Sequence, residues 1–386
     1  MMKRILFVTA RYPWPIITGD ALRAYNQIKE LSKDNLVDVF SVERANSSSG
    51  GVNSFINLSD SGGLSKLDKI KNIIINRGKT ALQCAMYNDR KSWEKLKDLL
   101  IANNYDIIIF QLVRLEYLIF KTISLRQEHC IKALIYCDFV DALSLNMQNR
   151  AATENFFMKK ICDFESKKLS VVENKIYEAI DAGFIISERD ANYIGKNDFK
   201  IIPNGVSIPV IHRNFKSSDG IINLAFWGNM SYYPNVKAAI FIANLFNDLP
   251  KGKYKLHIVG AQPCKQVMAL NKPNEIIIHG YVDDLKNLLA NMDIAVFPIF
   301  DGSGLQNKVL EAFALGLPVI TTNIVLDSML KLSEYAMVAN SKSEFIRAIE
   351  LFEPTEEGIN KNSLCAIEVL KKDYNWNLIN CVTGMK

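Results

Sequence analysis

Short apolar runs alternate with segments of helical period along the chain, most clearly between Asp293 and Thr322. The run Ile294–Phe300 is too brief for a helix and is followed by turn residues, so it predicts a buried parallel strand. Helix-forming sequence follows from Leu305 to Leu315, and Gly316 provides a stop signal. The apolar run Pro318–Thr322 then completes a predicted strand–helix–strand crossover.

The rest of the chain repeats this alternation and predicts two α/β sheets. In the second half, the expected strands are Ile222–Trp227, Tyr254–Val259, Glu275–Ile278, Ile294–Phe297, Pro318–Thr322 and Tyr335–Val338. In the first half, they are the apolar run of MMKRILFVTA, Tyr105–Gln111, Lys132–Cys137 and Ala182–Ser187. A segment at 45–63 that is rich in Ser, Gly and Asn predicts a loop. Strands separated by helical segments favour doubly wound sheets of the Rossmann type.

Composition and charge narrow the class of protein. The chain has 386 residues, of which 49% are hydrophobic and 23% charged, as expected for two globular domains. A net charge of +5, without a basic stripe interleaved with aromatic residues, argues against nucleic-acid binding. The four histidines lack metal-ligand spacing, so we expect no metal site.

The cysteines and the apolar runs bear on localisation. Seven scattered cysteines without a CxxC pair fit reduced thiols. No run approaches the ~20 apolar residues of a membrane span. The N-terminal apolar run is shorter than the ~7–15 residues of a signal segment. We therefore expect a cytoplasmic protein.

The crossover described above predicts an anion site at the start of its helix. Helix N-termini offer free backbone N–H groups and the positive end of a dipole. Gly304, Lys308 and Glu311 are spaced four and three residues apart and would share one helix face. A lysine there can reach a diphosphate, and a carboxylate can accept hydrogen bonds from a ribose diol, which suggests a nucleotide diphosphate. A solvated Lys–Glu pair worth ~0.3–0.5 kcal/mol is the alternative.

Three stretches of the second half resemble the family 4 glycosyltransferases of GT-B fold. GSGLQNKVLEAFALGLPVITT resembles the donor-site signature, LAFWGNMSYYPNVKAAIFIA the opening of the C-terminal domain, and IIIHGYVDDLKNLLANMDIAVFP the base-binding loop. The chain is most similar to bacterial sugar transferases of exopolysaccharide and surface-glycan assembly. The resemblance implies two Rossmann-like domains facing across a cleft, a nucleotide-sugar donor, no metal cofactor and retention of anomeric configuration.

The resemblance also implies roles for particular residues. Lys308 and Glu311 are expected to act on the leaving diphosphate and the ribose. The expected donor-binding residues are Gly19, Asn204, Gly228, Asn229, Tyr281, Val282, Gly302, Ser303, Gly304, Leu305, Lys308 and Glu311. Ser303 stands where many members have a glutamate that contacts the donor sugar, which leaves the identity of the sugar open. Asn229 stands where many have a basic residue, which leaves Lys308 as the main charge partner of the diphosphate.

The first domain is expected to bind the acceptor, because open α/β sheets bind ligands at the carboxyl ends of their strands. Arg11, Asp20 and Arg23 follow the first strand and are acceptor-side candidates, with capping and solvation of the next helix as the alternative. Asp138 and Asp141 follow a later strand and are candidate catalytic residues that contact the acceptor hydroxyl. Capping of the following helix is the alternative, and it suits Asp141 better.

These features predict the domain boundaries. The N-terminal domain is expected at 1–200, a hinge at 201–218 and the nucleotide-sugar-binding domain at 219–362. The resemblance implies a last helix, residues 363–386, that packs back on the first domain.

A basic stretch, Leu64–Tyr105, has helical period and holds nine basic against four acidic residues. Its interleaved apolar residues predict an amphipathic surface that contacts anionic lipid, with a solvated helical face as the alternative. A second basic helix is expected at Met158–Lys175. Because lipid-linked acceptors are frequent in the family, we expect peripheral contact with the inner face of the plasma membrane.

The sequence thus predicts a glycosyltransferase that moves a sugar from a nucleotide-diphosphate sugar to a glycan or lipid-linked acceptor in bacterial surface polysaccharide synthesis. One alternative is a catalytically inactive nucleotide-binding or scaffold subunit of a glycan-assembly complex. A second is a GT-B nucleotide-sugar epimerase. A Rossmann-type oxidoreductase is a third, although no GxGxxG follows the first strand. His279 is expected to be a structural residue at the end of a strand.

Overall fold

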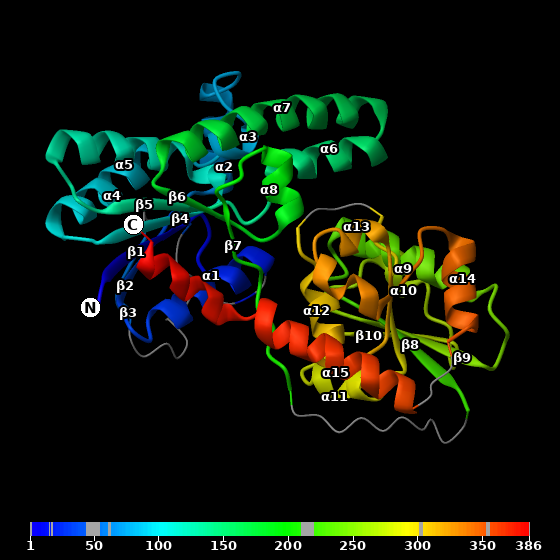
Figure 1. Cartoon of the computed structure of the whole chain (residues 1–386). Helices are drawn as coiled ribbons and strands as arrows, with labels where there is room; N and C mark the ends of the chain where they lie inside the picture. The colour runs from blue at the N-terminus through cyan, green and yellow to red at the C-terminus, as the bar shows by residue number, and fades with distance from the viewer. Residues whose placement is uncertain are drawn as a thin grey trace. The chain divides into compact units, whose positions relative to one another are not determined.

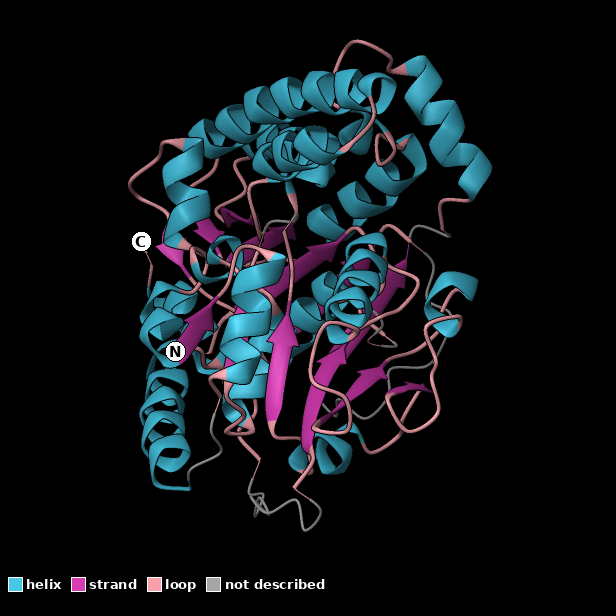
Figure 2. Cartoon of the chain, turned by 90° about the vertical axis from the view of Figure 1, so that its right-hand side faces the viewer, coloured by secondary structure: helices cyan, strands magenta, loops and turns pink. Residues whose placement is uncertain are grey.

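The computed structural model describes residues 2–14, 16, 18–43, 55–60, 63–209, 220–300, 304–352 and 356–385. The chain divides into two compact units: unit 1 comprises Met1–Asn204 and Trp376–Lys386, and unit 2 comprises Gly205–Asn375. Each unit holds a parallel sheet with helices packed on it (Figures 1 and 2). Residues 210–218 of the predicted hinge lie outside the described residues. Among the described residues, no helix is both long and apolar enough to cross a bilayer.

Unit 1 is built on a seven-stranded parallel sheet of order β3-β2-β1-β4-β5-β6-β7. The strands are β1 (Arg4–Thr9), β2 (Leu36–Ser41), β3 (Phe55–Asp60), β4 (Ile107–Gln111), β5 (Leu134–Asp138), β6 (Ala182–Ile185) and β7 (Lys200–Ile201). The central strand β1 pairs with β2 and β4, with Ile5 opposite Val37 and Ile107. Its side chains alternate between two hydrophobic cores, one on each face of the sheet. Burial on both faces explains why the sequence of this strand is an unbroken apolar run.

Three strands of unit 1 were not identified from the sequence. β2 and β7 extend the sheet on opposite sides. β3 lies inside the segment 45–63 that the composition predicted to be a loop, so that prediction was wrong for Phe55–Asp60. Its pairing with β2 supplies backbone hydrogen bonds that a residue-by-residue propensity does not register.

The helices of unit 1 cover both faces of its sheet (Figure 1). They are α1 (Gly19–Leu31), α2 (Lys66–Ile75), α3 (Leu82–Ala85), α4 (Arg90–Ala102), α5 (Glu116–His129), α6 (Leu143–Thr153), α7 (Phe156–Ala179) and α8 (Glu188–Ile194), with 3₁₀ segments η1 (Val113–Leu115) and η3 (Trp376–Gly384). Segment η3 packs beside α1 and buries Ile379 and Val382 in the same core as Ile28 and Leu31.

Unit 2 repeats the plan with a six-stranded parallel sheet of order β10-β9-β8-β11-β12-β13. Its strands are β8 (Ile222–Trp227), β9 (Tyr254–Val259), β10 (Ile276–Gly280), β11 (Ile294–Phe297), β12 (Val319–Thr321) and β13 (Ala336–Val338). All six strands expected in this half are present, with shifts of at most two residues at their ends. Its helical segments are α9 (Tyr233–Phe246), α10 (Lys265–Met268), α11 (Leu285–Ala290), α12 (Asn307–Ala314), α13 (Asn323–Leu326), η2 (Leu330–Tyr335), α14 (Lys342–Glu350) and α15 (Glu356–Asp373).

The C-terminal region corrects the prediction of one helix at 363–386. Helix α15 ends at Asp373 and packs against α12 and η2 within unit 2. Only the following 3₁₀ segment, η3, belongs to unit 1. The sequence pattern missed this division because both segments are amphipathic and only a short non-helical stretch separates them.

Candidate functional site

Three adjacent strands of unit 2 end in glycines with positive φ. Gly228 follows β8 with φ +149°, Gly260 follows β9 with φ +155°, and Gly280 ends β10 with φ +65°. The backbone N–H of Gly228 donates to Val259 O at 3.0 Å, and that of Gly260 donates to Gly280 O at 2.8 Å. A Cβ at position 260 would lie 1.7 Å from Gly228 O, so only glycine fits there. These half-buried glycines leave the backbone without side chains at the carboxyl ends of the strands, where open α/β sheets bind ligands.

Lys308 lies in the first turn of α12 and is half-buried. Its Nζ donates to Asn235 Oδ1 at 2.6 Å and sits 4.9 Å from the centroid of the Phe226 ring and 5.9 Å from that of Phe297. Burial lowers the pKa of Lys308 to about 7, and the nearby Glu311 carboxylate opposes that shift. The Lys308 side chain therefore changes between its protonated and neutral forms near pH 7.

Glu311 lies one turn further along α12 and is fixed by Trp227, the last residue of β8. Trp227 Nε1 donates to Glu311 Oε2 at 3.0 Å. Burial raises the pKa of the Glu311 carboxyl, and the Trp227 hydrogen bond and Lys308 oppose the increase. The Trp227 ring is itself held edge-on against Phe297, with centroids 4.8 Å apart. The structure therefore places the predicted Lys308 and Glu311 on one face of the same helix, where both are half-buried and each is hydrogen-bonded to a residue outside the helix.

Asn235 was not identified from the sequence, yet it joins two predicted parts of the site. Its Nδ2 donates to Asn229 O at 2.9 Å, and its Oδ1 accepts from Lys308. Its side chain is buried in the first turn of α9, directly after Pro234. The available signal was a polar residue at the start of an otherwise apolar helix, because a buried amide needs hydrogen-bond partners.

The glycine loop before α12 differs from its predicted geometry. Helix α12 begins at Asn307, and Gly304 has φ +72°, so Gly304 precedes the helix and does not belong to its first turn. Leu305 is buried. Gly302 and Ser303 lie outside the described residues. Lys308 and Glu311 keep their predicted shared face, because both lie within the helix.

The remaining donor-side residues of unit 2 lie at the ends of β8 and β10. Asn229 closes its own turn, since its Oδ1 accepts from the backbone N–H of Ser231 at 2.9 Å and from the Ser231 hydroxyl at 2.7 Å. Tyr281 is exposed and Val282 is half-buried, directly after Gly280. Binding of the base and the diphosphate by these residues stays a prediction.

His279 belongs to a polar chain that links the three neighbouring strands β10, β9 and β8 to Asp293, the residue before β11. Its Nε2 lies 2.9 Å from His257 Nδ1, and His257 Nε2 lies 3.3 Å from Asn223 Oδ1. The Asn223 amide in turn donates to Asp293 at 3.2 Å. Burial is the main reason why the pKa of His257 is lowered to about 4, so this ring is neutral at pH 7. The chain ties strands together, in line with the expected structural role of His279.

In unit 1, the structure places Arg23 and Asp138 in a buried ion pair. Both side chains are fully buried, with Arg23 Nε and Nη2 donating to the two Asp138 oxygens at 2.7 and 2.9 Å. Gln27 Nε2 also donates to Asp138 at 2.9 Å. Arg23 Nη1 donates to Ile202 O at 2.8 Å and to Asn204 Oδ1 at 2.9 Å. This geometry argues against the prediction that Arg23 and Asp138 contact an acceptor, because their polar atoms are used inside the fold.

The other residues predicted in unit 1 are more accessible. Arg11 Nη1 lies 3.4 Å from Asp20 Oδ2 in a partly exposed pair. Gly19 begins α1, whose N-cap residue makes no side-chain hydrogen bond. Asp141 does not cap α6, since Ala142 holds the N-cap position, and its Oδ2 accepts from Asn146 Nδ2 at 2.7 Å. Acceptor contact by Arg11, Asp20 or Asp141 stays a prediction.

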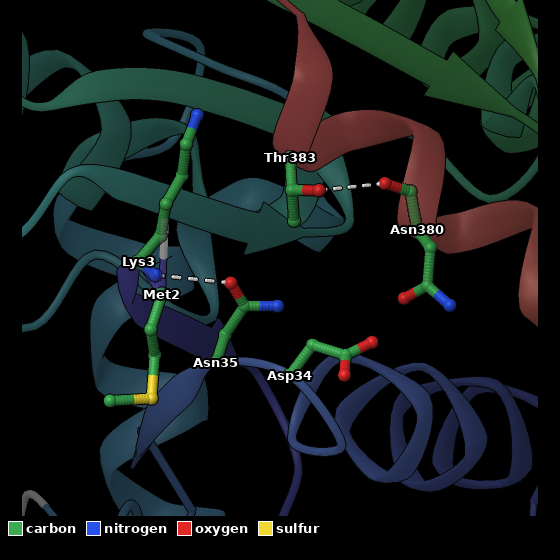
Figure 3. Close-up of a pocket in the computed structure, with 6 residues that line it drawn as sticks. All are labelled: Met2, Lys3, Asp34, Asn35, Asn380 and Thr383. Atoms are coloured by element: carbon green, nitrogen blue, oxygen red, sulfur yellow. Dashed lines mark hydrogen bonds between the residues drawn. The ribbon is translucent and has the colours of Figure 1, made fainter.

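Unit 1 has a cavity of about 390 Å³ at the end of its sheet that lies opposite the carboxyl ends of the strands. It is lined by Met2, Lys3, Asp34, Asn35, Asn380 and Thr383 (Figure 3). The first four residues precede β1 and β2, so the cavity lies at the amino ends of the strands. We do not assign substrate binding to this cavity, because open α/β sheets bind ligands at their carboxyl ends. Within the described residues, no three His, Cys, Asp or Glu side chains are grouped so that they could hold a metal ion.

Comparisons with known proteins agree with this geometry. Residues 222–352 match the family model described as glycosyl transferases group 1. This match covers the strand-end glycines, Asn235, Lys308 and Glu311, and it supports a glycosyltransferase enzyme. No curated protein sequence matches the chain.

Solved structures show that the chain has the GT-B fold. Sucrose-phosphate synthase from Thermosynechococcus elongatus has a TM-score of 0.70 at 15% identity, over 99% of this chain and 97% of that chain. The apo form of the lipopolysaccharide outer core galactosyltransferase WaaB has a TM-score of 0.63 at 12% identity, over 99% of both chains. Anabaena HepE in complex with UDP and glucose has a TM-score of 0.64 at 13% identity, over 99% of this chain and 98% of that chain.

Proposed function

We propose that the protein transfers a sugar from a nucleotide-diphosphate sugar to a glycan or lipid-linked acceptor. The observation that carries the proposal is the half-buried pair of Lys308 and Glu311 at the start of α12, each fixed from outside the helix, by Asn235 and Trp227 respectively. The pKa values of both side chains are shifted by desolvation, and ionisable groups with shifted pKa values gather at ligand and active sites. The family match of residues 222–352 supports the same reading.

In this proposal Lys308 and the N-terminus of α12 stabilise the diphosphate as it leaves. The negative charge on the bridging oxygen grows as the glycosidic bond breaks, so a cation fixed beforehand stabilises the transition state more than the ground state. Other transferases use a divalent cation for this task. We therefore propose a metal-independent reaction. Glu311 would accept hydrogen bonds from the ribose hydroxyls and position the nucleotide.

The identity of the substrates is proposed from the similar proteins. HepE was solved with UDP and glucose, which favours UDP as a first donor base to test. WaaB is a lipopolysaccharide outer core galactosyltransferase, which favours a role in bacterial surface polysaccharide synthesis. We also propose that the reaction retains the anomeric configuration, which the family resemblance supports. We further propose that the protein acts in the cytoplasm, in peripheral contact with the membrane that holds a lipid-linked acceptor.

A thermal-shift panel of UDP-, GDP-, dTDP- and ADP-sugars tests the donor site. A ligand at one hundred times its dissociation constant stabilises the folded state by ~2.7 kcal/mol. We expect one nucleotide to stabilise the parent protein, and Lys308→Met and Glu311→Gln to weaken its binding or its turnover at least tenfold, about 1.4 kcal/mol. The matched control is Lys251→Met, which removes an exposed lysine of unit 2.

The outcomes separate the alternatives. Transfer at the parental rate by both variants would reject the site assignment. Product formed without any acceptor would indicate an epimerase. Stabilisation by a nucleotide without turnover of any donor would indicate a catalytically inactive binding subunit.

A further inference from the structure

We propose that helices α7 and α2 of unit 1 form a docking surface for an anionic lipid bilayer. This inference deepens the proposed function and rests on it in one respect, the lipid-linked acceptor. The side chains of this surface lie outside the proposed donor site. It also changes the predicted contact from the whole stretch Leu64–Tyr105 to two defined helix faces.

Helix α7 carries an apolar stripe on its outer face, interrupted by Lys168. Phe157, Ile161, Phe164, Lys168 and Val171 follow each other at intervals of four and three residues, so they share one face of the helix. Phe157 is 72% exposed, Phe164 49% and Val171 52%. Exposed aromatic rings in a row cost free energy in water, and such patches mark interaction sites.

The opposite side of α7 packs the helix onto unit 1. Residues that include Cys162, Leu169, Val172 and Ile176 are buried against unit 1. The outer stripe is therefore not needed for packing within unit 1. Figure 1 draws α7 along the upper edge of that unit.

Helix α2 presents a second stripe of the same kind. Leu67, Ile70 and Ile74 are spaced three and four residues apart and are 78%, 55% and 68% exposed. No residue of α2 is buried. One hydrogen bond connects α7 to the segment that follows α2, since Lys168 Nζ donates to Gly78 O at 2.9 Å, three residues beyond the end of α2.

The charge of the surface selects the occupant. Lys159, Lys160, Lys167 and Lys168 accompany the stripe of α7, and Lys66 and Lys71 accompany that of α2. The acids of α7 near the stripe are Asp163 and the buried Glu165, which accepts from two backbone N–H groups at the start of α3. Two copies of this surface would bring lysines together, whereas anionic headgroups would neutralise them.

The amphipathic pattern fits a helix that lies in the plane of an interface. Apolar side chains would enter the acyl boundary while lysine stems extend to the headgroups. The cations already pack on the rings, with Lys160 Nζ 4.4 Å from the centroid of Phe156 and Lys168 Nζ 5.8 Å from that of Phe164. This arrangement would place the ammonium groups beside the rings, at headgroup level.

Co-sedimentation of the full chain with phosphatidylcholine vesicles, with and without phosphatidylglycerol, tests the proposal. We expect the parent protein to bind the vesicles that contain phosphatidylglycerol. Phe157→Ser/Phe164→Ser should weaken this binding at least tenfold. Lys160→Gln/Lys167→Gln should remove most of the difference in affinity between the two vesicle types. Each lysine removed should lower the affinity for phosphatidylglycerol vesicles on the order of fivefold.

Leu351→Ser/Leu364→Ser is the matched control, because both leucines are exposed on unit 2. It should bind vesicles like the parent. Absence of parent binding to phosphatidylglycerol vesicles, or unchanged binding by the double phenylalanine variant, would overturn the proposal. Light scattering that shows a dimer of the parent, dissolved by Phe157→Ser/Phe164→Ser, would assign the surface to a second copy and also overturn it.

The thermal-shift panel run on the same variants separates this proposal from the proposed function. Nucleotide stabilisation should be unchanged in the phenylalanine and lysine variants. Loss of vesicle binding with intact nucleotide binding supports the docking surface. If the parent binds vesicles but no nucleotide sugar stabilises the parent or any variant, the docking surface is supported and the donor site is rejected.

Discussion

Lys308 is the residue whose chemistry is most altered by its surroundings. Its half-buried ammonium group lies over two aromatic rings and is hydrogen-bonded to Asn235, and desolvation lowers its pKa to about 7. In the proposed complex a diphosphate would add negative charge beside Nζ, and this charge would raise the pKa again. Binding above pH 7 would then take up a proton.

Donor affinity should therefore depend on pH in a defined direction. Below pH ~7 Lys308 is already protonated and affinity should be flat. Above it affinity should fall, by up to about tenfold per pH unit, because the proton taken up becomes scarcer. Calorimetry of a nucleotide sugar in buffers of different ionisation enthalpy measures both the affinity and the proton uptake. Lys308→Met should lose the pH dependence, and a flat affinity of the parent between pH 6 and 9 would contradict this role.

Some residues of the site were predictable singly, and others were not. Lys308 and Glu311 are recognisable from their spacing in a crossover helix. Asn235 and Trp227 reach them from α9 and β8, which lie more than seventy positions earlier in the sequence. Arg23 and Asp138 show the converse, because their loop positions suggested ligand contact and their burial in one ion pair gives them a structural role. Spacing along the chain does not reveal which polar groups meet after folding.

At the scale of the elements, the strand-end glycines of unit 2 decide how closely β8, β9 and β10 approach at their carboxyl ends. Gly260 is the most constrained of them, because its Cα faces the carbonyl oxygen of Gly228. A side chain there would separate the ends of two strands that flank the proposed donor site. The hydrogen bond from Gly228 N to Val259 O would then be disturbed.

Gly260→Ala should destabilise unit 2 by on the order of 3 kcal/mol or more, since the new Cβ clashes with backbone that cannot rotate away. Gly252→Ala is the control, because Gly252 also has positive φ but a Cβ added there would meet no heavy atom within 4 Å. It should cost only about 1–2 kcal/mol. Denaturant unfolding measures both values. Equal losses of unfolding free energy in the two variants would show that the strain of positive φ alone accounts for the effect, and that the close approach of the strands adds nothing to it.

At the scale of the whole molecule, the chain returns to unit 1 after completing unit 2. Trp376–Lys386 is separated in sequence from the rest of unit 1 by the whole of unit 2. Ile379 and Val382 are fully buried in the core that α1 forms on its sheet. The last residues are thus part of the hydrophobic core of the first unit.

Ile379→Ala should lower the free energy of unfolding of unit 1 by about 2–5 kcal/mol, because it leaves a cavity beside α1. Cys381→Ala, at an exposed position of the same segment, is the control. Hydrogen exchange read by mass spectrometry follows the two units separately. Peptides of β1 and β2 should lose protection while those of β8 and β9 keep it, and equal loss in both units would contradict the assignment of the segment to unit 1.

The sequence alone determined the α/β class, the six strands of unit 2 and the Lys308–Glu311 pair, because these depend on local periodicity and on spacing within one helix. It did not determine β3 or the division between α15 and η3, since strand pairing and packing partners lie far away along the chain. Only the tertiary structure showed that Asn235 and Trp227 hold the pair and that Arg23 and Asp138 satisfy each other. Burial and hydrogen bonding between distant segments decide whether a charged residue is available to a ligand.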